Sequence, residues 1–236
     1  MTKLEISGEA VMIEIYVKEL DGVYFGLAHV RGKIVATTVD SARERTLKNL
    51  RRSLPPSVNH QIVEKESDFA EKTILALEKA HRGVQEFKDF DLAAEYLPEP
   101  LYSVLKAAAA IPVGYVASYG SIAKASGTEP RVVGQIMASN PLYPIVPCHR
   151  VVGADFSLVG YGGGKSPQAL KVKLARLSSE CRGFGSAKEI SVNGTVFKVY
   201  PTEHVIDKAR KQRLTLSERR QRTLVSFGLN SLHGSI

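Results

Sequence analysis

A cysteine and a histidine stand side by side at Cys148 and His149, within the segment NPLYPIVPCHRVVG at residues 140–153. A thiolate is a strong nucleophile, but a free thiol has a pKa of about 8.5 and needs a neighbouring base or cation to ionise at neutral pH. His149 and Arg150 are candidates for that role. The alternative is a cysteine buried as a small hydrophobic residue, which is the commoner situation for an isolated cysteine.

The chain on both sides of this pair is unusual. Three prolines, at 141, 144 and 147, fix φ and remove hydrogen-bond donors, so Cys148 follows a stiff extended segment. Adjacent side chains of a strand point to opposite faces, so His149 reaches the sulfur only if the backbone turns or a water bridges the gap. Downstream, the glycines around Tyr161 either let backbone approach a flat ligand or form a plain connector.

The composition is that of an ordinary globular protein of 236 residues, long enough for one large or two small domains. No apolar run approaches the roughly 20 residues that span a bilayer. Two cysteines fit a reducing compartment and are too few for a disulfide framework or a cysteine-rich zinc site. We therefore expect a cytoplasmic protein (nuclear if eukaryotic), with no membrane association, no metal and no cofactor.

The hydrophobic pattern predicts the elements that position these residues. Three β-rich runs between residues 11 and 39, separated by Asp21-Gly22 and Arg31-Gly32, predict an antiparallel meander. Residues 88–100, with two prolines and scattered acids, are expected to be a linker. Helices are predicted over residues 41–54, 68–83, 101–111, 121–127 and 130–140. The tight turn between the helices at 121–127 and 130–140 is typical of a helix-turn-helix.

Taken together, four segments closely resemble the DNA-binding domain of the methylated-DNA-protein-cysteine methyltransferases, or alkylguanine-DNA alkyltransferases. They are IPVGYVASYGSIAKASG, RVVGQIMASNP, PIVPCHRVVG and LVGYGGG. The resemblance runs from about Leu97 to about Leu177, and its Pro-Cys-His-Arg-Val core is very specific. We expect an α+β fold: a small ribonuclease-H-like domain of meander and helices at 1–90, a winged-helix-like helix-turn-helix domain at 91–180, and a C-terminal hairpin and helix extension at 181–236.

The resemblance implies a DNA repair protein, a methylated-DNA-[protein]-cysteine S-methyltransferase. It would flip 6-O-alkylguanine out of double-stranded DNA and transfer the alkyl group irreversibly to Cys148, acting once and as a monomer. His149 would relay the thiol proton through a water, Tyr119 would contact the flanking phosphate and the leaving base, and Arg131 would fill the vacated stack. Further implied residues are Asn140 in the active-site segment, Arg150 in the surrounding network and at the DNA, and Met137, Val151, Tyr161, Gly162 and Gly163 in the substrate pocket.

Two departures from the family pattern affect these roles. The family's catalytic histidine is polarised by a glutamate near the end of the last helix, here KVKLARLSSE. One register of that helix puts Ser178 in the position and the other puts Glu180, and the Ser178 register keeps the apolar spacing better. The turn between Gly127 and Arg131 is also shorter than the family pattern, which bears on how Arg131 projects.

Other classes of protein remain open on the sequence alone. A noncatalytic binder of alkylated DNA is disfavoured because such proteins lack this cysteine. A helix-turn-helix regulator would leave the Pro-Cys-His-Arg segment without a purpose. A thiol hydrolase could use Cys148 and His149, but it would turn over repeatedly.

Positive charge gathers at the C-terminus. Residues 181–236 hold ten Lys and Arg against four Asp and Glu, which is +6 of the net charge of +8. The Asn193-Gly194 pair predicts a β-hairpin, and helices are expected after it. Within them, Lys208 to Arg222 carries seven cations and one acid. This segment is either a solvated helix face or an arm that binds phosphates.

If the arm binds phosphates, deleting residues 186–236 is expected to weaken binding to any duplex. The slope of log K against log salt should flatten by about 0.9 for each phosphate that the truncated chain no longer binds, and the reaction of a free alkylated base should barely change. Salt titrations of the full-length and truncated chains measure this slope. An unchanged slope in a folded truncated chain would assign the segment to a solvated face.

Overall fold

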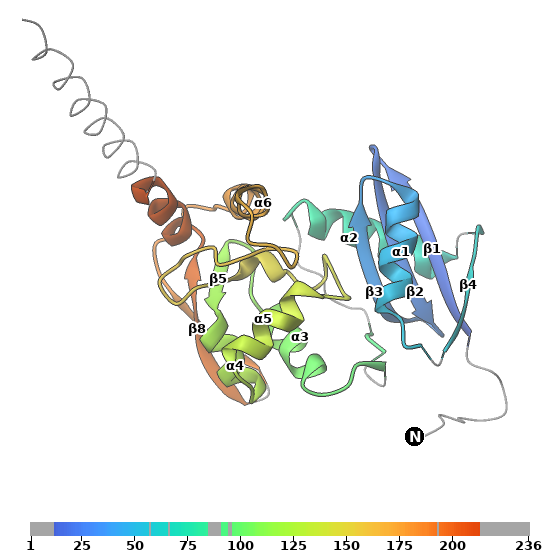
Figure 1. The fold of residues 1–236 in the computed structure, drawn as a ribbon, viewed down its shortest axis with the longest axis horizontal. Coiled ribbons are helices and arrows are strands. Elements are labelled where there is room, and N and C mark those ends of the chain that lie inside the picture. Colours follow the sequence, from blue (N-terminus) through green and yellow to red (C-terminus); the bar gives the residue numbers. More distant parts are fainter. Residues whose placement is uncertain are drawn as a thin grey trace, which may run out of the picture.

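The computed structural model describes residues 12–56, 58–65, 67–84, 91–93, 96–192 and 194–212. It has an N-terminal unit and a C-terminal unit, each built on a four-stranded sheet (Figure 1). The α+β class expected from the sequence is confirmed. No helix within these residues is long and apolar enough to cross a membrane.

The N-terminal sheet has the strand order β3-β2-β1-β4. Its strands are β1 (Met12–Leu20), β2 (Val23–Val30), β3 (Lys33–Asp40) and β4 (Asn59–Ile62). The first three pair antiparallel through turns in which Asp21-Gly22 and Arg31-Gly32 all have positive φ, so the predicted meander is confirmed. Strand β4 pairs parallel to β1 and was not anticipated, because its four residues are all exposed and show no apolar alternation.

Two helices cover opposite faces of this sheet (Figure 1). Helix α1 (Arg43–Ser53) packs on the face that carries Ile13, Ile15 and Ala28. Gly26 permits the close approach, since a Cβ there would lie 2.6 Å from the Thr46 methyl and 2.8 Å from Leu50. Helix α2 (Asp68–His81) buries Ile74 and Leu77 on the other face, in a core that continues into the C-terminal unit.

The segment expected to be a linker is partly built into the N-terminal sheet. The Ile34 N–H donates to the Asp91 carbonyl at 2.8 Å, and the Ala93 N–H donates to the Ile34 carbonyl at 2.8 Å. Ala93 is fully buried. A plain linker is therefore the wrong description for residues 91–93, because their backbone hydrogen bonds are made by β3.

The C-terminal unit contains the predicted helix pair. Its helices are α3 (Leu101–Ala109), α4 (Tyr119–Ser126), α5 (Pro130–Ala138) and α6 (Pro167–Ser179). The Ser118 hydroxyl caps α4 by accepting from the Ser121 N–H at 3.0 Å, and Gly127 ends α4 with φ of 65°. Residues 127–129 connect α4 to α5, which starts on Pro130, so the turn of the helix-turn-helix is short.

The second sheet joins the C-terminal hairpin to this unit. Its strands, in the order β6-β5-β8-β7, are β5 (Tyr115–Ser118), β6 (Val151–Val152), β7 (Lys188–Val192) and β8 (Thr195–Pro201). The hairpin predicted around Gly194 is confirmed. Tyr200 and Pro201 of β8 pair with Val116 and Tyr115 of β5, so the boundary expected near residue 181 falls within one packed unit (Figure 1). Residues 203–212 are helical, and residues 213–236, with most of the basic segment, lie outside the described part.

Candidate active site

Cys148 sits at a sharp turn of the backbone. The 3-10 turn η2 spans Cys148–Arg150, and inside it the Arg150 N–H donates to the Pro147 carbonyl at 2.8 Å. The Cys148 N–H donates to the Val146 carbonyl at 2.9 Å. Because the chain turns here, His149 is not forced to the face opposite the sulfur, as it would be in an extended strand.

Asn140 fixes the segment that carries the cysteine. Its Nδ2 donates to the Val146 carbonyl at 2.8 Å, and its Oδ1 accepts from the Leu142 N–H at 3.0 Å. The side chain thereby ties the end of α5 to the proline-rich segment, as the resemblance implied. The nearby Asn140 side chain also acts to lower the pKa of Cys148, although burial has the larger, opposite effect.

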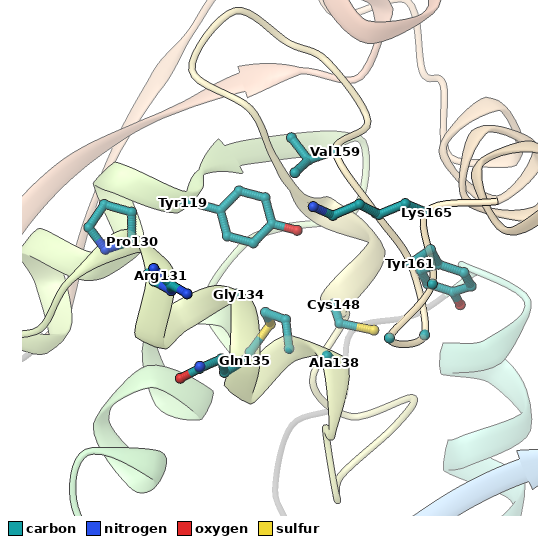
Figure 2. A pocket seen from close by; sticks show the side chains of 15 residues that line it. Tyr119, Pro130, Arg131, Gly134, Gln135, Ala138, Cys148, Val159, Tyr161 and Lys165 are labelled. Atoms are coloured by element: carbon teal, nitrogen blue, oxygen red, sulfur yellow. The ribbon is translucent and has the colours of Figure 1, made fainter. Parts of the chain in front are cut away.

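The sulfur opens into a cavity of about 540 Å³, a size suited to a small flat ligand. Figure 2 shows Tyr119 and Tyr161 on either side of Cys148, with Arg131 on α5 and Val159 on the facing loop. The residues that line the cavity are Tyr119, Pro130, Arg131, Gly134, Gln135, Met137, Ala138, Cys148, Val159, Gly160, Tyr161, Gly162, Gly163, Gly164 and Lys165. Its walls are mainly apolar, and one wall is a run of glycines.

The cavity includes most of the residues expected in it, and one correction is needed. Met137, Tyr161, Gly162 and Gly163 line it, whereas Val151 is fully buried in the core and does not. Val151 belongs to the short strand β6 and faces the hydrophobic cluster under α4 and α5. The lining residues Gly134, Gln135 and Ala138 were missed, although their spacing from Arg131 is that of one helix face.

His149 is paired with the carboxylate of Glu180. Its Nε2 lies 2.8 Å from Glu180 Oε1, and both side chains are almost fully buried. Of the two registers considered, the structure has the one that places Glu180 beside His149; the Ser178 hydroxyl is exposed and donates to the Leu174 carbonyl at 2.9 Å. The buried face of α6 runs through Lys173 and Leu177, so the next inward position is Glu180, the residue that caps the helix. The apolar pattern of the sequence did not reveal this buried face, because one of its residues is the charged Lys173.

Arg150 serves the same carboxylate, and its expected place at the DNA is also wrong. Its Nε donates to Glu180 Oε2 at 2.8 Å and its Nη2 to Glu180 Oε1 at 2.9 Å. Its Nη1 donates to the Ile111 carbonyl at 2.7 Å, and the residue is 5% exposed. A guanidinium enclosed in this way cannot reach a phosphate. It holds the surrounding network, which is the other role that the resemblance implied.

The charges of this triad follow from burial and pairing. Burial alone would raise the pKa of the Glu180 carboxyl, but hydrogen bonds from His149 and Arg150 outweigh it and hold the pKa at about 2. Burial lowers the pKa of His149 against the opposing pull of Glu180, so the imidazole is neutral at pH 7. The ionised Glu180 accepts a hydrogen bond from the Nε2–H group of His149, which leaves Nδ1 as the unprotonated, basic nitrogen. Nδ1 is buried and has no hydrogen-bond partner among the described residues.

The thiol itself is held in its neutral form. Burial raises the pKa of Cys148, and Asn140 and the cations of Lys173 and Arg176 only partly offset that rise. Lys173 is fully buried on α6, where its Nζ donates to the carbonyls of Val151, Leu158 and Gly160 at 2.6, 3.1 and 3.0 Å. Burial lowers the pKa of Lys173 to about 8. The sequence did not single out Lys173, because a helical lysine is usually solvated.

Tyrosines close the cavity on two sides. Burial and the nearby Cys148 raise the pKa of Tyr119 to about 12, so its hydroxyl remains a hydrogen-bond donor at neutral pH. On the other side, Tyr161 and Tyr143 pack against the same hydrophobic cluster, and the Tyr143 hydroxyl lies 3.1 Å from Nδ1 of His81 on α2. The cavity wall is thus connected to the N-terminal unit. Among the described residues, no group of His, Cys, Asp and Glu side chains is arranged to hold a metal ion.

Comparisons with known proteins agree with this geometry. Residues 101–181 match the family model described as 6-O-methylguanine DNA methyltransferase, DNA binding domain. Methylated-DNA–protein-cysteine methyltransferases of Pyrobaculum aerophilum and Archaeoglobus fulgidus are 61% identical over 54 residues and 47% identical over 77 residues. These matches cover 23% and 31% of this chain, and 36% and 52% of the two relatives. The chain thus spans about a third to a half of the curated relatives that it matches.

Solved structures extend the similarity beyond this domain. The crystal structure of O6-methylguanine-DNA methyltransferase from Pyrococcus kodakaraensis has a TM-score of 0.51 at 26% identity, over 72% of this chain and 99% of that one. A single-residue variant of the Mycobacterium tuberculosis O6-methylguanine methyltransferase gives a TM-score of 0.51 at 25% identity, over 74% and 96% of the two chains. The fold, the cysteine turn and the family match agree, and residues 101–181 of this chain match the DNA-binding domain of the 6-O-methylguanine DNA methyltransferases.

Proposed function

We propose that this chain is a DNA repair protein that transfers the alkyl group of 6-O-alkylguanine to Cys148 in a single irreversible turnover. The observation that carries the proposal is that one turn holds a buried thiol and, next to it in the chain, a buried neutral imidazole whose Nε2 donates to Glu180 and whose Nδ1 has no partner among the described residues. This arrangement suits one proton transfer in an enclosed apolar site.

The transfer begins with loss of the thiol proton. His149 accepts that proton at Nδ1 through a bridging water, and the ionised Glu180 stabilises the imidazolium that results. The thiolate then attacks the alkyl carbon, so a C–S bond forms as the C–O6 bond breaks. The electron pair of the broken bond stays on the guanine. The Tyr119 hydroxyl, a donor at neutral pH, hydrogen bonds to the leaving base. The base takes up a proton from solvent and the imidazolium of His149 releases the thiol proton to solvent, so that overall the thiol proton replaces the alkyl group on the guanine.

The product supports a single use of the protein. The C–S bond of the thioether is stable, and regeneration would need a second nucleophile to remove the alkyl group from Cys148. The other cysteine, Cys181, does not line the cavity, and its thiol faces the Leu177 carbonyl and the Thr202 hydroxyl. The reaction therefore ends with the alkylated chain, which separates this proposal from a thiol hydrolase.

Access to a base within duplex DNA requires flipping, which costs a few kcal/mol in unstacking. Arg131 lies in the first turn of α5, exposed and at the edge of the cavity (Figure 2). A side chain in that position can occupy the space that the flipped nucleotide leaves. The proposed partner is therefore double-stranded DNA carrying 6-O-alkylguanine, bound by a monomer through the helix-turn-helix.

Cys148→Ala is expected to abolish transfer and to leave DNA binding nearly unchanged, because the sulfur is a reactant and does not touch a phosphate. Cys181→Ala is the matched control and should transfer normally. Mass spectrometry of the chain after mixing with methylated duplex DNA should find one added methyl on the Cys148 peptide. Repeated turnover would indicate a hydrolase, binding without a mass gain would indicate a binder, and transfer that depends on Cys181 would refute the assignment.

Arg131→Ala is expected to slow repair of duplex substrate much more than reaction with a free benzylated guanine base, since the free base needs no extrusion. Single-turnover rates on the two substrates measure the difference. Equal losses on both would make Arg131 a residue of the cavity or of protein stability.

Glu180→Gln is expected to slow transfer by about 10²- to 10⁴-fold, the range of general acid–base catalysis. It should also reduce the free energy of unfolding by roughly 3 to 5 kcal/mol, because Arg150 loses its buried counter-ion. Glu180 raises the pKa of His149, so its loss lowers that pKa further and moves the acid limb of the rate profile to lower pH.

Ser178→Ala is the control for this prediction. It removes the hydroxyl that the alternative register would place beside His149, and in the structure this hydroxyl makes only one exposed hydrogen bond. Rates from pH 4 to pH 8 and urea unfolding curves decide the outcome. A slow Ser178→Ala beside a normal Glu180→Gln would overturn the relay.

A further inference from the structure

One wall of the cavity is held in an unfavourable backbone conformation. The segment Gly153–Gly160, here called the wall loop, runs from strand β6 to the glycines beside Tyr161. Phe156 has φ of 64° and Val159 has φ of 51°, in the left-handed region that bulky and β-branched residues rarely adopt. Val159 lines the cavity and is 46% exposed. Strain of this kind persists only where surrounding contacts enforce it.

Several of the contacts that enforce it come from outside the family match, which ends at residue 181. The Phe156 ring meets Tyr200 of strand β8 edge to face, with centroids 5.3 Å apart, and lies 5.0 Å from the His204 ring. Phe156 and Leu158 of the wall loop pack with Tyr200 and Ile206 around a small separate core. The buried members of that core are Val116, Val152, Leu177 and Val205. Side chains of the C-terminal extension thus form the surface on which the wall loop rests.

An ion pair adds a second attachment. Lys208, in the helical residues 203–212, donates from Nζ to the Asp155 carbonyl at 2.7 Å and also binds the Asp155 carboxylate. The Asp155 side chain is largely exposed, so this pair contributes less than the aromatic packing. It does fix the position of the residue that precedes Phe156. From the opposite side, Lys173 holds the carbonyls of Leu158 and Gly160.

We propose that residues 195–208 of the C-terminal extension act as a clamp that positions the wall loop, and with it Val159, for binding of the flat base. Phe156, Tyr200, His204 and Lys208 are then positioning residues, since none of them lines the cavity. The role of the clamp in binding the base rests on the proposed function. It also replaces an expectation from the sequence: deleting residues 186–236 removes the clamp and one strand pairing of β5, so the free-base reaction should slow as well.

Two variants test the clamp in the full-length chain. Phe156→Gly removes the ring and leaves a residue that tolerates positive φ, and Lys208→Met removes the ion pair but keeps most of the side chain. Lys208→Arg should restore the pair. Lys198→Met is the matched control, because Lys198 is exposed on the same strand β8 and has no ion-pair partner among the described residues.

Hydrogen exchange measures the clamp without any catalytic readout. Amide exchange over residues 153–160 is expected to accelerate roughly tenfold in Phe156→Gly, less in Lys208→Met, and not at all in Lys208→Arg or Lys198→Met. Unchanged exchange in Phe156→Gly and Lys208→Met, or equal acceleration in Lys198→Met, overturns the clamp.

Reaction with the free benzylated guanine base measures its effect on binding. The half-saturating concentration of the base should rise roughly three- to tenfold in Phe156→Gly, while the limiting transfer rate per active site stays the same, because Cys148, His149 and Glu180 are untouched. A purely structural effect would lower the active fraction and leave this concentration unchanged, which would overturn the positioning role. If the wild-type chain transfers no alkyl group, the proposed function fails and the exchange comparison still decides the clamp.

Discussion

The buried carboxylate of Glu180 constrains both the chemistry of the site and the packing around it. It accepts hydrogen bonds from His149 and Arg150, and its desolvation is tolerable only because both partners are in place. Its contribution to stability is complete above pH 4.5 and is lost as the pH falls toward 2, since folding holds its pKa at about 2. Gly83, which follows helix α2, lies directly against it: a Cβ on Gly83 would lie 3.0 Å from Glu180 Cγ. The N-terminal unit therefore closes the space around the acid.

The sequence predicted those elements whose pattern is local and regular. The meander, the helices α1 to α5 and the β7–β8 hairpin follow from alternation, helical periodicity, caps and turn residues, and these signals act over a few residues. Most of the cavity residues followed from a specific motif, whereas the sequence left open whether the backbone turns at Cys148. Strand β4 and the pairing of residues 91–93 with β3 could not be predicted, because their hydrogen bonds depend on partners far away in the chain.

The open choice of the acid and the wrong placement of Arg150 have one physical origin, which is that polar groups are buried where a pattern analysis expects solvent. Lys173 occupies an inward position of α6 because three backbone carbonyls satisfy its ammonium, and its charge made the apolar spacing fit the Ser178 register better than the Glu180 register. The resemblance implied that Arg150 lies at the DNA, yet its guanidinium is enclosed by Glu180 and the Ile111 carbonyl. Val151 is adjacent to the motif but lies on the core side of β6. Satisfaction of a buried polar group is a property of the whole fold and not of a short sequence.

The burial of Cys148 also bears on the lifetime of the protein before it meets its substrate. Oxidants and small electrophiles attack thiolates, and a thiol that is enclosed, with its pKa raised, presents little thiolate to them. A reagent must also enter a cavity whose walls are mainly apolar. Under the proposed single-turnover reaction, such chemical inertness preserves the pool of competent molecules between damage events. The same enclosure makes the thiol depend on its own imidazole for activation, so reactivity is confined to compounds that fit beside Tyr119 and Tyr161.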